Sequence, residues 1–381
     1  MKYRPFGKLG WDVSALGFGA MRLPVIEKDQ SKIDESEAIR MIRHAIDQGV
    51  NYVDTAWPYH GGNSEPLVAK ALQDGYREKV KIATKMPSWM IQKAEDFDHY
   101  LNLQQERLQT DCIEFYMAHG LNKTRWPALK EMGLLEWAEK AKADGRIEFF
   151  SFSFHDDYDA FKDIIDGYDK WDFCQVQYNY VDTDFQAGRR GVKYAAERDV
   201  AVIVMEPLRG GQITKEPAEP IAKLWAEAPK PRKLADWALQ WVWNQPEVAM
   251  ALSGMTTMQH VEENLVSAEN SAVGILSDDE LDLIDKVAEK FIELNPIQCT
   301  ECNYCIPCPN DVSIPQIMRY YNEGFVFADH GISRWRYRQI PEENQALNCD
   351  KCGECEEVCP QELPVSDWME KAHGWLGPKP K

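Results

Sequence analysis

Hydrophobic and polar positions follow two alternating patterns along the first 290 residues or so. Short, mainly apolar runs, typical of strands buried on both faces, are each followed by a longer stretch with apolar residues at helical spacing. The apolar runs lie at 14–19, 50–56, 80–85, 112–120, 146–153, 173–180, 200–208 and 248–254. The helical stretches lie at 36–49, 64–75, 97–109, 134–145, 157–168, 191–199, 232–245 and 260–270. These eight strand–helix units predict an α/β fold, a (β/α)8 TIM barrel.

An open, doubly wound sheet is the structural alternative, but no G-x-G-x-x-G follows the first strand, which weakens it. Residues 277–293 predict a helix that closes the barrel, and residues 295–298 a linker into a cysteine-rich tail. In that tail, 313–325 and 365–376 have helical patterns. We therefore predict two domains, a barrel over 1–294 and a small, mainly α-helical domain over 295–381.

Composition and charge narrow the function classes. The chain has 381 residues, of which 44% are hydrophobic, which excludes a disordered protein. Its 43 basic and 62 acidic residues give a net charge of −19, which argues against nucleic acid or an anionic membrane as main partner. This charge permits a basic partner protein. No apolar run approaches the ~18 residues of a membrane-spanning helix, and the N-terminus shows no secretory signal. We expect a cytoplasmic protein.

Polar residues stand where the predicted strands end. Asp54 ends the second strand and is followed by Tyr59, Lys85 ends the third strand, and His119 ends the fourth. In a TIM barrel, chemistry takes place at these carboxyl ends. Each residue alone is equally compatible with a satisfied polar role, but four at successive strand ends favour a site. Here the sequence resembles the aldo/keto reductase superfamily over about residues 1–290, and the four residues match its catalytic tetrad in order.

The chemistry of these residues fits the reduction of a carbonyl group. A phenol has a pKa near 10, and a neighbouring ammonium favours the phenolate and lowers that pKa. Tyr59 is thus the predicted general acid, Lys85 supplies the charge, and Asp54 holds Lys85. His119 donates a hydrogen bond to the substrate oxygen. Trp57, Trp89 and Trp126 are candidates for an aromatic pocket, with core or rim packing as the alternative.

The resemblance also implies a nicotinamide cofactor, NADP or NAD, bound at the same rim without a Rossmann motif. Ser153 and Gln175 match the residues that bind the carboxamide, and Glu263 and Asn264 those that contact adenine. The loop Pro207, Leu208, Arg209 and Gly210 follows the seventh strand, and its amides are suited to the pyrophosphate, with Arg209 adding charge or forming a solvated loop residue.

Three positions depart from the family pattern. Phe154 stands where the family usually has an Asn that contacts the carboxamide. Gly254 and His260 stand where it commonly has the Lys and Arg that hold the adenosine 2′-phosphate. Because 2′-phosphate recognition relies on charge-assisted hydrogen bonds, we expect weakened selection for NADPH over NADH.

Eight of the ten cysteines lie in two groups near the C-terminus. The second group, Cys349, Cys352, Cys355 and Cys359 before Pro360, has the C-x2-C-x2-C-x3-C-P spacing of a bacterial [4Fe–4S] ferredoxin. The first group is one residue shorter in its last spacing and consists of Cys299, Cys302, Cys305 and Cys308. We predict two [4Fe–4S] clusters with crossed ligation, in which Cys359 joins the first three cysteines and Cys308 joins the second three. Zinc is the alternative metal.

The sequence therefore resembles a fusion of an aldo/keto reductase barrel and a ferredoxin-like domain. We predict an oxidoreductase that reduces an aldehyde, ketone or quinone-like carbonyl. Nicotinamide transfers two electrons as hydride, whereas each cluster transfers one. Three roles therefore stay open for the clusters: they relay electrons to the barrel site, they exchange electrons with a redox partner protein, or they only stabilise the tail. The rival functions are a redox-sensing or regulatory subunit, and an electron-transfer subunit, each with the barrel as a scaffold.

Overall fold

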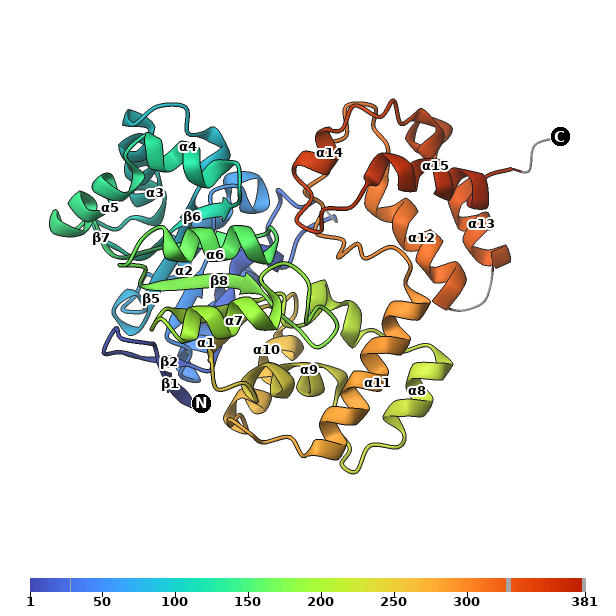
Figure 1. Cartoon of the computed structure of the whole chain (residues 1–381), viewed down its shortest axis with the longest axis horizontal. Coiled ribbons are helices and arrows are strands. Elements are labelled where there is room, and N and C mark those ends of the chain that lie inside the picture. The colour runs from blue at the N-terminus through green and yellow to red at the C-terminus, as the bar shows by residue number, and fades with distance from the viewer. Residues whose placement is uncertain (28, 327–329, 379–381) are drawn as a thin grey trace. The chain divides into compact units, whose positions relative to one another are not determined.

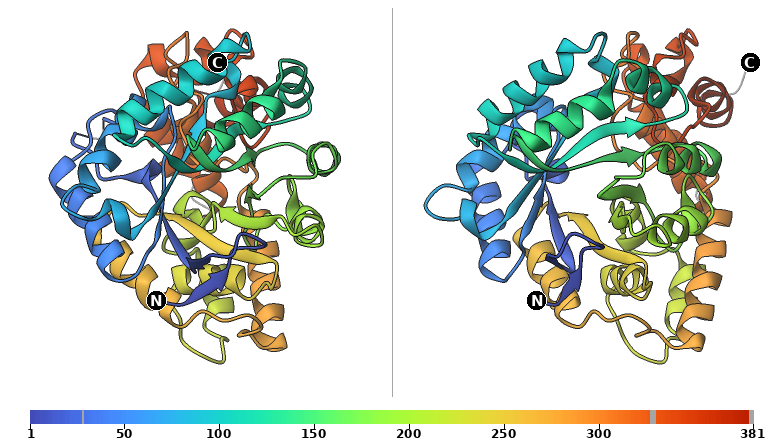
Figure 2. Two further views of the ribbon diagram at one scale, coloured as in Figure 1. Left: turned by 90° about the vertical axis from the view of Figure 1, so that its left-hand side faces the viewer. Right: turned by 60° about the vertical axis from the view of Figure 1, so that its left-hand side comes forward.

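The computed structural model describes residues 1–27, 29–326 and 330–378. Eight parallel strands close into a barrel in the order β10-β3-β4-β5-β6-β7-β8-β9, so the chain passes around the barrel in sequence order (Figure 1). Two further views show the helices of the first part of the chain outside these strands (Figure 2). The predicted TIM barrel is confirmed, and a helical region that carries the cysteines follows it.

The eight predicted strands and their helices match the observed elements closely. The strands are β3 (Leu16–Gly19), β4 (Tyr52–Asp54), β5 (Lys81–Met86), β6 (Ile113–Leu121), β7 (Ile147–Phe154), β8 (Phe173–Gln177), β9 (Ala201–Met205) and β10 (Val248–Gly254). The helices up to the last strand and just after it are α1 (Glu35–Asp47), α2 (Ser64–Ala71), α3 (Glu95–Leu108), α4 (Arg125–Glu131), α5 (Leu134–Ala143), α6 (Tyr158–Asp166), α7 (Gly188–Ala196), α8 (Glu219–Trp225), α9 (Leu234–Trp243) and α10 (Met258–Glu269). Helices α4 and α8, each of seven residues, were not predicted because two turns are too short to show a period.

An N-terminal hairpin, also not predicted, packs at the amino ends of the strands. Strands β1 (Tyr3–Pro5) and β2 (Asp12–Ser14) pair antiparallel. Between them Phe6 is fully buried, and its ring lies 5.4 Å from that of Phe115 in β6 and 6.0 Å from that of Phe173, the first residue of β8. These aromatic rings fill that end of the barrel, and the polar residues singled out above lie at the opposite, carboxyl ends of the strands.

Contacts divide the chain into two compact units. The first unit comprises residues 1–207 and 235–276 and holds the barrel. The second comprises 208–234 and 277–381 and holds helix α8, helix α11 (Asp278–Leu294) and the cysteine-rich tail. The boundary at 294/295 stays a prediction.

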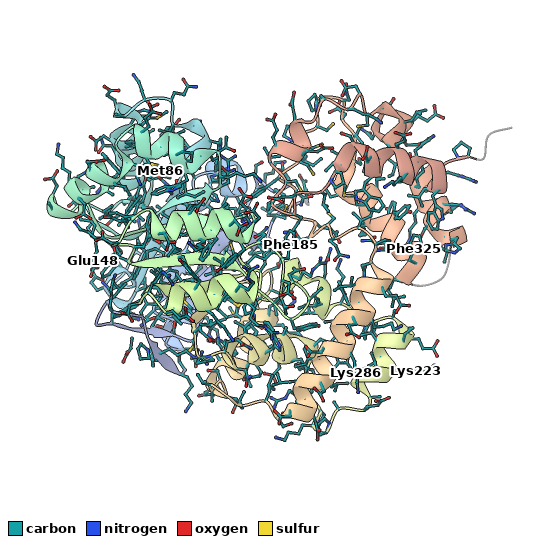
Figure 3. All side chains as sticks on the ribbon, viewed as in Figure 1. Met86, Glu148, Phe185, Lys223, Lys286 and Phe325 are labelled. Atoms are coloured by element: carbon teal, nitrogen blue, oxygen red, sulfur yellow. The ribbon has the colours of Figure 1, made fainter. Side chains whose placement is uncertain are left out.

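Helix α11 corresponds to the predicted closing helix and packs on α8 within the second unit; Lys286 and Lys223 mark the two helices in Figure 3. It begins at a capping box, in which Ser277 and Glu280 satisfy each other's backbone N–H groups. Arg232 in the preceding segment contacts the buried Glu280 at 3.3 Å. This cap therefore ties the start of α11 to residue 232.

The tail forms a small helical core of its own. Helices α12 (Ile314–Val326) and α15 (Val365–Leu376) confirm the two predicted helices, whereas α13 (His330–Arg338) and the four-residue α14 (Glu354–Glu357) were not predicted. Phe325 on α12, labelled in Figure 3, stacks on Trp375 of α15 with ring centroids 5.2 Å apart. Cys299, Cys305, Cys308, Cys349 and Cys355 pack against this core. Among the described residues, no helix is long and apolar enough to cross a membrane.

Candidate active site

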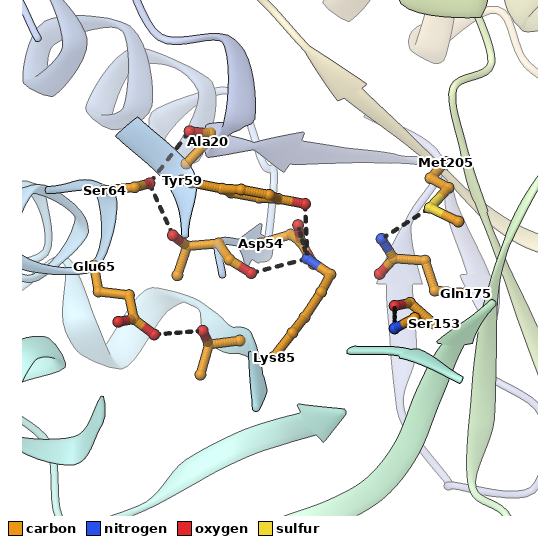
Figure 4. Close-up of polar contacts among 12 residues, drawn as sticks. Ala20, Asp54, Tyr59, Ser64, Glu65, Lys85, Ser153, Gln175 and Met205 are labelled. Atoms are coloured by element: carbon orange, nitrogen blue, oxygen red, sulfur yellow. Dashed lines mark hydrogen bonds and ion pairs between the residues drawn. The ribbon is translucent and has the colours of Figure 1, made fainter. Parts of the chain in front are cut away.

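The carboxyl ends of three neighbouring strands bring Asp54, Lys85 and His119 to one end of the barrel. Asp54 is the last residue of β4, Lys85 lies in β5 and His119 in β6. Tyr59 begins the short 3-10 helix η2 (Tyr59–Gly62) that follows β4. The structure thus brings together all four residues that the sequence singled out (Figure 4 shows three of them). Their catalytic roles stay predictions.

Lys85 lies at the centre of this group. Its Nζ donates hydrogen bonds to both carboxylate oxygens of Asp54, at 2.6 and 2.8 Å, and to the carbonyl oxygen of Thr55 at 2.8 Å. The same Nζ lies 3.4 Å from the Tyr59 hydroxyl (Figure 4). Since its bonds to Asp54 and Thr55 fix the ammonium, Lys85 presents a positioned charge to the phenol.

Burial governs the electrostatics of the ion pair. It raises the pKa of Asp54 and lowers the pKa of Lys85, and the mutual attraction of the two groups opposes both shifts. Both side chains are almost fully buried. Removal of one partner would therefore leave the other as an uncompensated buried charge, at a cost of about 3–5 kcal/mol.

The surroundings of His119 favour the neutral form of its imidazole ring. Burial, and then the charge of Lys85, lower its pKa well below the ordinary value. Its ring lies 6.2 Å from that of Tyr59 and 5.1 Å from that of Trp89. Its Nδ1 is buried and has no hydrogen-bond partner among the described residues. A neutral imidazole here can donate one hydrogen bond and accept another.

A second layer of buried polar residues supports Lys85, and the sequence analysis missed it. Glu65 accepts hydrogen bonds from Thr84 at 2.7 Å and from Gln104 at 2.5 Å, and Gln104 also donates to the carbonyl oxygen of Lys85 at 3.1 Å. Burial raises the pKa of Glu65. The available signal was a glutamate and a glutamine on the inward faces of two amphipathic helices.

The two predicted carboxamide-binding residues lie on the next strands. Ser153 in β7 accepts a hydrogen bond from the Gly120 N–H at 2.8 Å. The Nε2 atom of Gln175 in β8 lies 3.7 Å from the Met205 sulfur. The buried Oε1 atom of Gln175 has no hydrogen-bond partner within the described part of the chain. Phe154 packs on Phe161 of α6 at 5.1 Å, so its ring belongs to the layer between strands and helices. An orphaned buried amide oxygen fits a site that a hydrogen-bond donor of a cofactor completes.

The last predicted segment lies at the start of α10. Asn264 is buried and donates to the Ser253 hydroxyl at 3.0 Å, and Glu263 accepts a hydrogen bond from Gln259 at 2.8 Å. His260 is exposed, and its backbone N–H donates to Thr257. A Cβ at Gly254 would lie 3.2 Å from the Cβ of Arg22, so Arg22 lies along the space of the missing side chain.

The loop after β9 turns through two glycines in left-handed backbone conformations, Gly210 (φ 64°) and Gly211 (φ 87°). Arg209 is fully buried, and its guanidinium donates to Gln212 at 2.8 Å and to Gln298 at 2.5 Å. The alternative of a solvated loop charge is therefore wrong. Like Pro207, Leu208 and Gly210, Arg209 stays a predicted contact of the pyrophosphate.

None of the eight tail cysteines, all of which the structure describes, forms a disulfide bond. Burial raises the pKa of Cys299 to about 11, and the charge of Cys359 contributes to this rise. Burial likewise raises the pKa of Cys355 to about 11, with contributions from Glu356 and Cys349. Soft thiolates that repel one another fit an iron–sulfur cluster, whose positive irons would relieve that repulsion. No three side chains among the described residues converge as ligands of one metal ion.

Comparisons with known proteins agree with this geometry. Residues 15–289 match the aldo/keto reductase family, and residues 298–363 match the 4Fe-4S dicluster domain. An NADH-specific methylglyoxal reductase of Escherichia coli is 25% identical over 333 residues, covering 76% of this chain and 99% of its own. L-galactose dehydrogenase of Arabidopsis thaliana is 26% identical over 302 residues, covering 70% of this chain and 88% of its own.

Among solved structures, the holo form of an aldo-keto reductase from Bacillus halodurans has a TM-score of 0.63 and 26% identity, over 75% of this chain and 96% of its own. Fold and family match together define an NAD(P)H-dependent oxidoreductase on a TIM barrel. The chain belongs to the aldo/keto reductase family and carries a C-terminal 4Fe-4S dicluster domain.

Proposed function

We propose that the barrel reduces an aldehyde, ketone or quinone-like carbonyl, with Tyr59 as the general acid. The contact that carries this proposal is the 3.4 Å approach of the Lys85 ammonium to the Tyr59 hydroxyl. A reduced nicotinamide, when bound, would supply the hydride for the carbonyl carbon. Tyr59 donates its proton to the carbonyl oxygen, and Lys85 stabilises the negative charge that develops on the phenol oxygen.

Asp54 and His119 complete the arrangement. Asp54 holds Lys85 in place with two hydrogen bonds, so the ammonium cannot turn away from Tyr59. Because its pKa is lowered, His119 stays neutral and orients the substrate oxygen as a hydrogen-bond donor. Trp89 lies 5.1 Å from His119 and is 45% exposed, which suits the wall of a substrate pocket. Trp126 packs on Trp171 in the core instead, at 5.7 Å.

We further propose that Ser153 and Gln175 hold the carboxamide, that residues 207–210 contact the pyrophosphate, and that Glu263 and Asn264 contact adenine. The orphaned Oε1 of Gln175 supports the first assignment, since a carboxamide NH2 would satisfy it. Gly254 and the exposed His260 offer no fixed cation for a 2′-phosphate. The E. coli relative is named as specific for NADH, which agrees with weak selection for NADPH here.

For the tail we propose two [4Fe–4S] clusters with crossed ligation. Cys299, Cys302, Cys305 and Cys359 would hold one, and Cys349, Cys352, Cys355 and Cys308 the other. Two observations support this division: the charges of Cys299, Cys302 and Cys359 all act on Cys305, and those of Cys349 and Cys352 act on Cys355. Such clusters supply one-electron transfer.

The second group offers the access that a redox partner protein needs, because Cys352 is the one exposed cysteine among the eight. We therefore propose that electrons enter or leave through this group.

Turnover with different carbonyl classes tests the proposal. Anaerobic protein is given NADPH or NADH and, in separate assays, an aldehyde, a ketone and a quinone, and the oxidation of the nicotinamide is followed by absorbance. We expect turnover with one class and its loss in Lys85→Met. The control is Lys81→Met, a partly buried lysine at the opposite, amino end of the same strand, where it pairs with Glu148 at 2.5 Å. Absence of turnover with all three classes, in protein with bound nicotinamide, would favour the scaffold functions instead.

A further inference from the structure

Arg125 is a cation that the proposed reduction does not use. It is the first residue of α4, in the segment that follows β6, the strand that carries His119. Its Nη1 donates a hydrogen bond to the carbonyl oxygen of Gly120 at 2.9 Å. The N–H of the same glycine donates to the hydroxyl of Ser153, a predicted partner of the nicotinamide carboxamide. Gly120, which directly follows His119, thus connects Arg125 to the end of the barrel where the reduction would take place.

The loop that carries Arg125 is held in place by its own contacts. The backbone N–H groups of Arg125 and Thr124 both donate to the side-chain oxygen of Asn122, at 2.7 and 3.1 Å. The next residue, Trp126, is buried, and its ring packs on that of Trp171. Because this backbone is already fixed, a ligand that binds Arg125 would not have to order it.

The guanidinium of Arg125 has donors to spare. Arg125 is partly buried and burial lowers its pKa, yet no carboxylate among the described residues forms an ion pair with it. Nη1 is bound to Gly120, whereas Nε and Nη2 have no hydrogen-bond partner in the part of the chain that the structure describes. The N–H groups of Nε and Nη2 form one side of the planar guanidinium and can bind both oxygens of a carboxylate or phosphate. Lys123 in the same loop, by contrast, contacts Asp156 at 3.3 Å and Asp157 at 3.6 Å.

The other groups at this end of the barrel leave the charge of Arg125 uncompensated. Burial lowers the pKa of His155 to about 4, and the charges of Arg125 and Lys85 contribute. Burial and then the charge of Lys85 lower the pKa of His119, and Arg125 adds to this shift. Both imidazoles are therefore neutral, and Asp54 balances Lys85. A partly desolvated guanidinium without a counter-charge fits a site that an anionic ligand completes.

We propose that Arg125 binds an anionic group of the substrate, so that the substrate class is an aldehyde or ketone that also carries a carboxylate or a phosphate. This inference rests on the proposed carbonyl reduction and names its substrate class. The cofactor pyrophosphate is a separate anion, because its predicted contacts at 207–210 follow β9, which is three strands further around the barrel than β6. Arg125 holds the anion while His119 orients the carbonyl oxygen.

Steady-state kinetics with matched pairs of compounds test this inference. Anaerobically purified, full-length protein with NADPH or NADH is given glyoxylate, pyruvate and succinic semialdehyde, each compared with its neutral methyl ester. A further pair, glyceraldehyde phosphate and glyceraldehyde, tests phosphate as the anion. We expect kcat/KM for at least one anionic compound to exceed that of its neutral partner by about tenfold or more, because only the anion forms charge-assisted hydrogen bonds with Arg125.

Three variants show whether Arg125 causes this preference. In Arg125→Gln the ratio of the two kcat/KM values should fall to within about threefold of one, chiefly through a higher KM for the anion. Each ratio is taken within one protein, so a general loss of activity cancels. Arg125→Lys keeps the charge but loses the paired donors, so its ratio should be intermediate. Lys123→Gln, the control, removes an exposed cation of the same loop that already pairs with Asp156, and it should keep the wild-type ratio.

Equal kcat/KM values for every anionic compound and its neutral partner, or a preference that survives in Arg125→Gln, would overturn the inference. A Kd for NADPH that is about tenfold weaker in Arg125→Gln would overturn it as well, because Arg125 would then bind the cofactor. Absence of turnover with every carbonyl compound would instead refute the proposed reduction. Calorimetric titration of the NADP-loaded protein with succinic semialdehyde separates the two failures, since binding needs no turnover: the wild type should bind it about tenfold more tightly than Arg125→Gln.

Discussion

The barrel site and the cysteine-rich tail reach their chemistry in opposite ways. In the barrel, Lys85 already has its partners, because Asp54 and Thr55 accept its hydrogen bonds at 2.6 to 2.8 Å. In the tail, burial raises the pKa of Cys299 and Cys355, and neighbouring thiolates add to the rise. Protein groups alone thus stabilise the first arrangement, whereas the second needs iron to compensate its charge. A fold can fix a catalytic group through hydrogen bonds alone. Thiolates that repel one another reach a stable arrangement only when they bind a positively charged metal centre.

The largest expected effect comes from removing the predicted general acid, Tyr59, from the barrel site. In Tyr59→Phe we expect kcat for carbonyl reduction to fall by about 100- to 10,000-fold, because only the proton donor is lost. The Kd of NADPH, measured by fluorescence titration, should change less than about twofold. Tyr116→Phe is the matched control, since its buried hydroxyl bonds to Gln104 and lies in the supporting layer. A near-normal kcat in Tyr59→Phe would remove Tyr59 from the mechanism.

Replacing single cysteines of the tail tests whether they hold two iron–sulfur clusters with crossed ligation. The anaerobic wild-type protein should contain about eight iron atoms, and Cys359→Ser about four. Crossed ligation requires that Cys359→Ser and Cys302→Ser lose the same paramagnetic signal, whereas Cys308→Ser should lose the signal that Cys352→Ser loses. Cys112→Ser, a change at a free cysteine of the barrel, should keep all the iron. Stoichiometric zinc in protein prepared with adequate iron would contradict the cluster assignment.

The sequence predicted the barrel well and its supporting contacts poorly, and both have physical reasons. Strands buried on both faces leave an unmistakable apolar run, so β3 to β10 could be located and Asp54 and Lys85 placed at their ends. The ligands of a cluster are likewise visible because their spacing is local. The hydrogen bonds of Gln104 and Arg209 join residues 19 and 89 positions apart, and no local pattern records such a pairing.

The choice between NADPH and NADH tests the barrel site at the place where the 2′-phosphate is expected to bind. Gly254 and His260 offer no fixed positive charge there. We expect the wild-type protein to favour NADPH over NADH only weakly. His260→Arg should raise that preference by about tenfold or more, since one charge-assisted hydrogen bond is worth about 1.5–3 kcal/mol. His260→Gln, which adds no charge, is the control, and the ratio of the two Kd values is the measurement. Strong wild-type selection for NADPH would show that another cation, such as Arg22 beside Gly254, recognises the phosphate.

The smallest expected effect concerns pH and arises in the barrel alone. Burial lowers the pKa of His119 well below 6.5, so the unfolded chain binds a proton at this residue at pH values where the folded protein does not. The stability that depends on neutral His119 is therefore complete above pH 6.5 and is lost as the pH falls from 6.5 toward the folded pKa. Between pH 7.5 and 5.5 the loss should be about 1 kcal/mol.

Urea unfolding of holoprotein at these two pH values measures the loss, and His119→Asn should reduce it by about that amount. Any acid sensitivity of the clusters is common to both proteins and cancels in the difference. An identical pH dependence in wild type and His119→Asn would mean that the folded protein binds a proton at His119 as readily as the unfolded chain does, which would contradict the lowered pKa on which the neutral role of His119 rests.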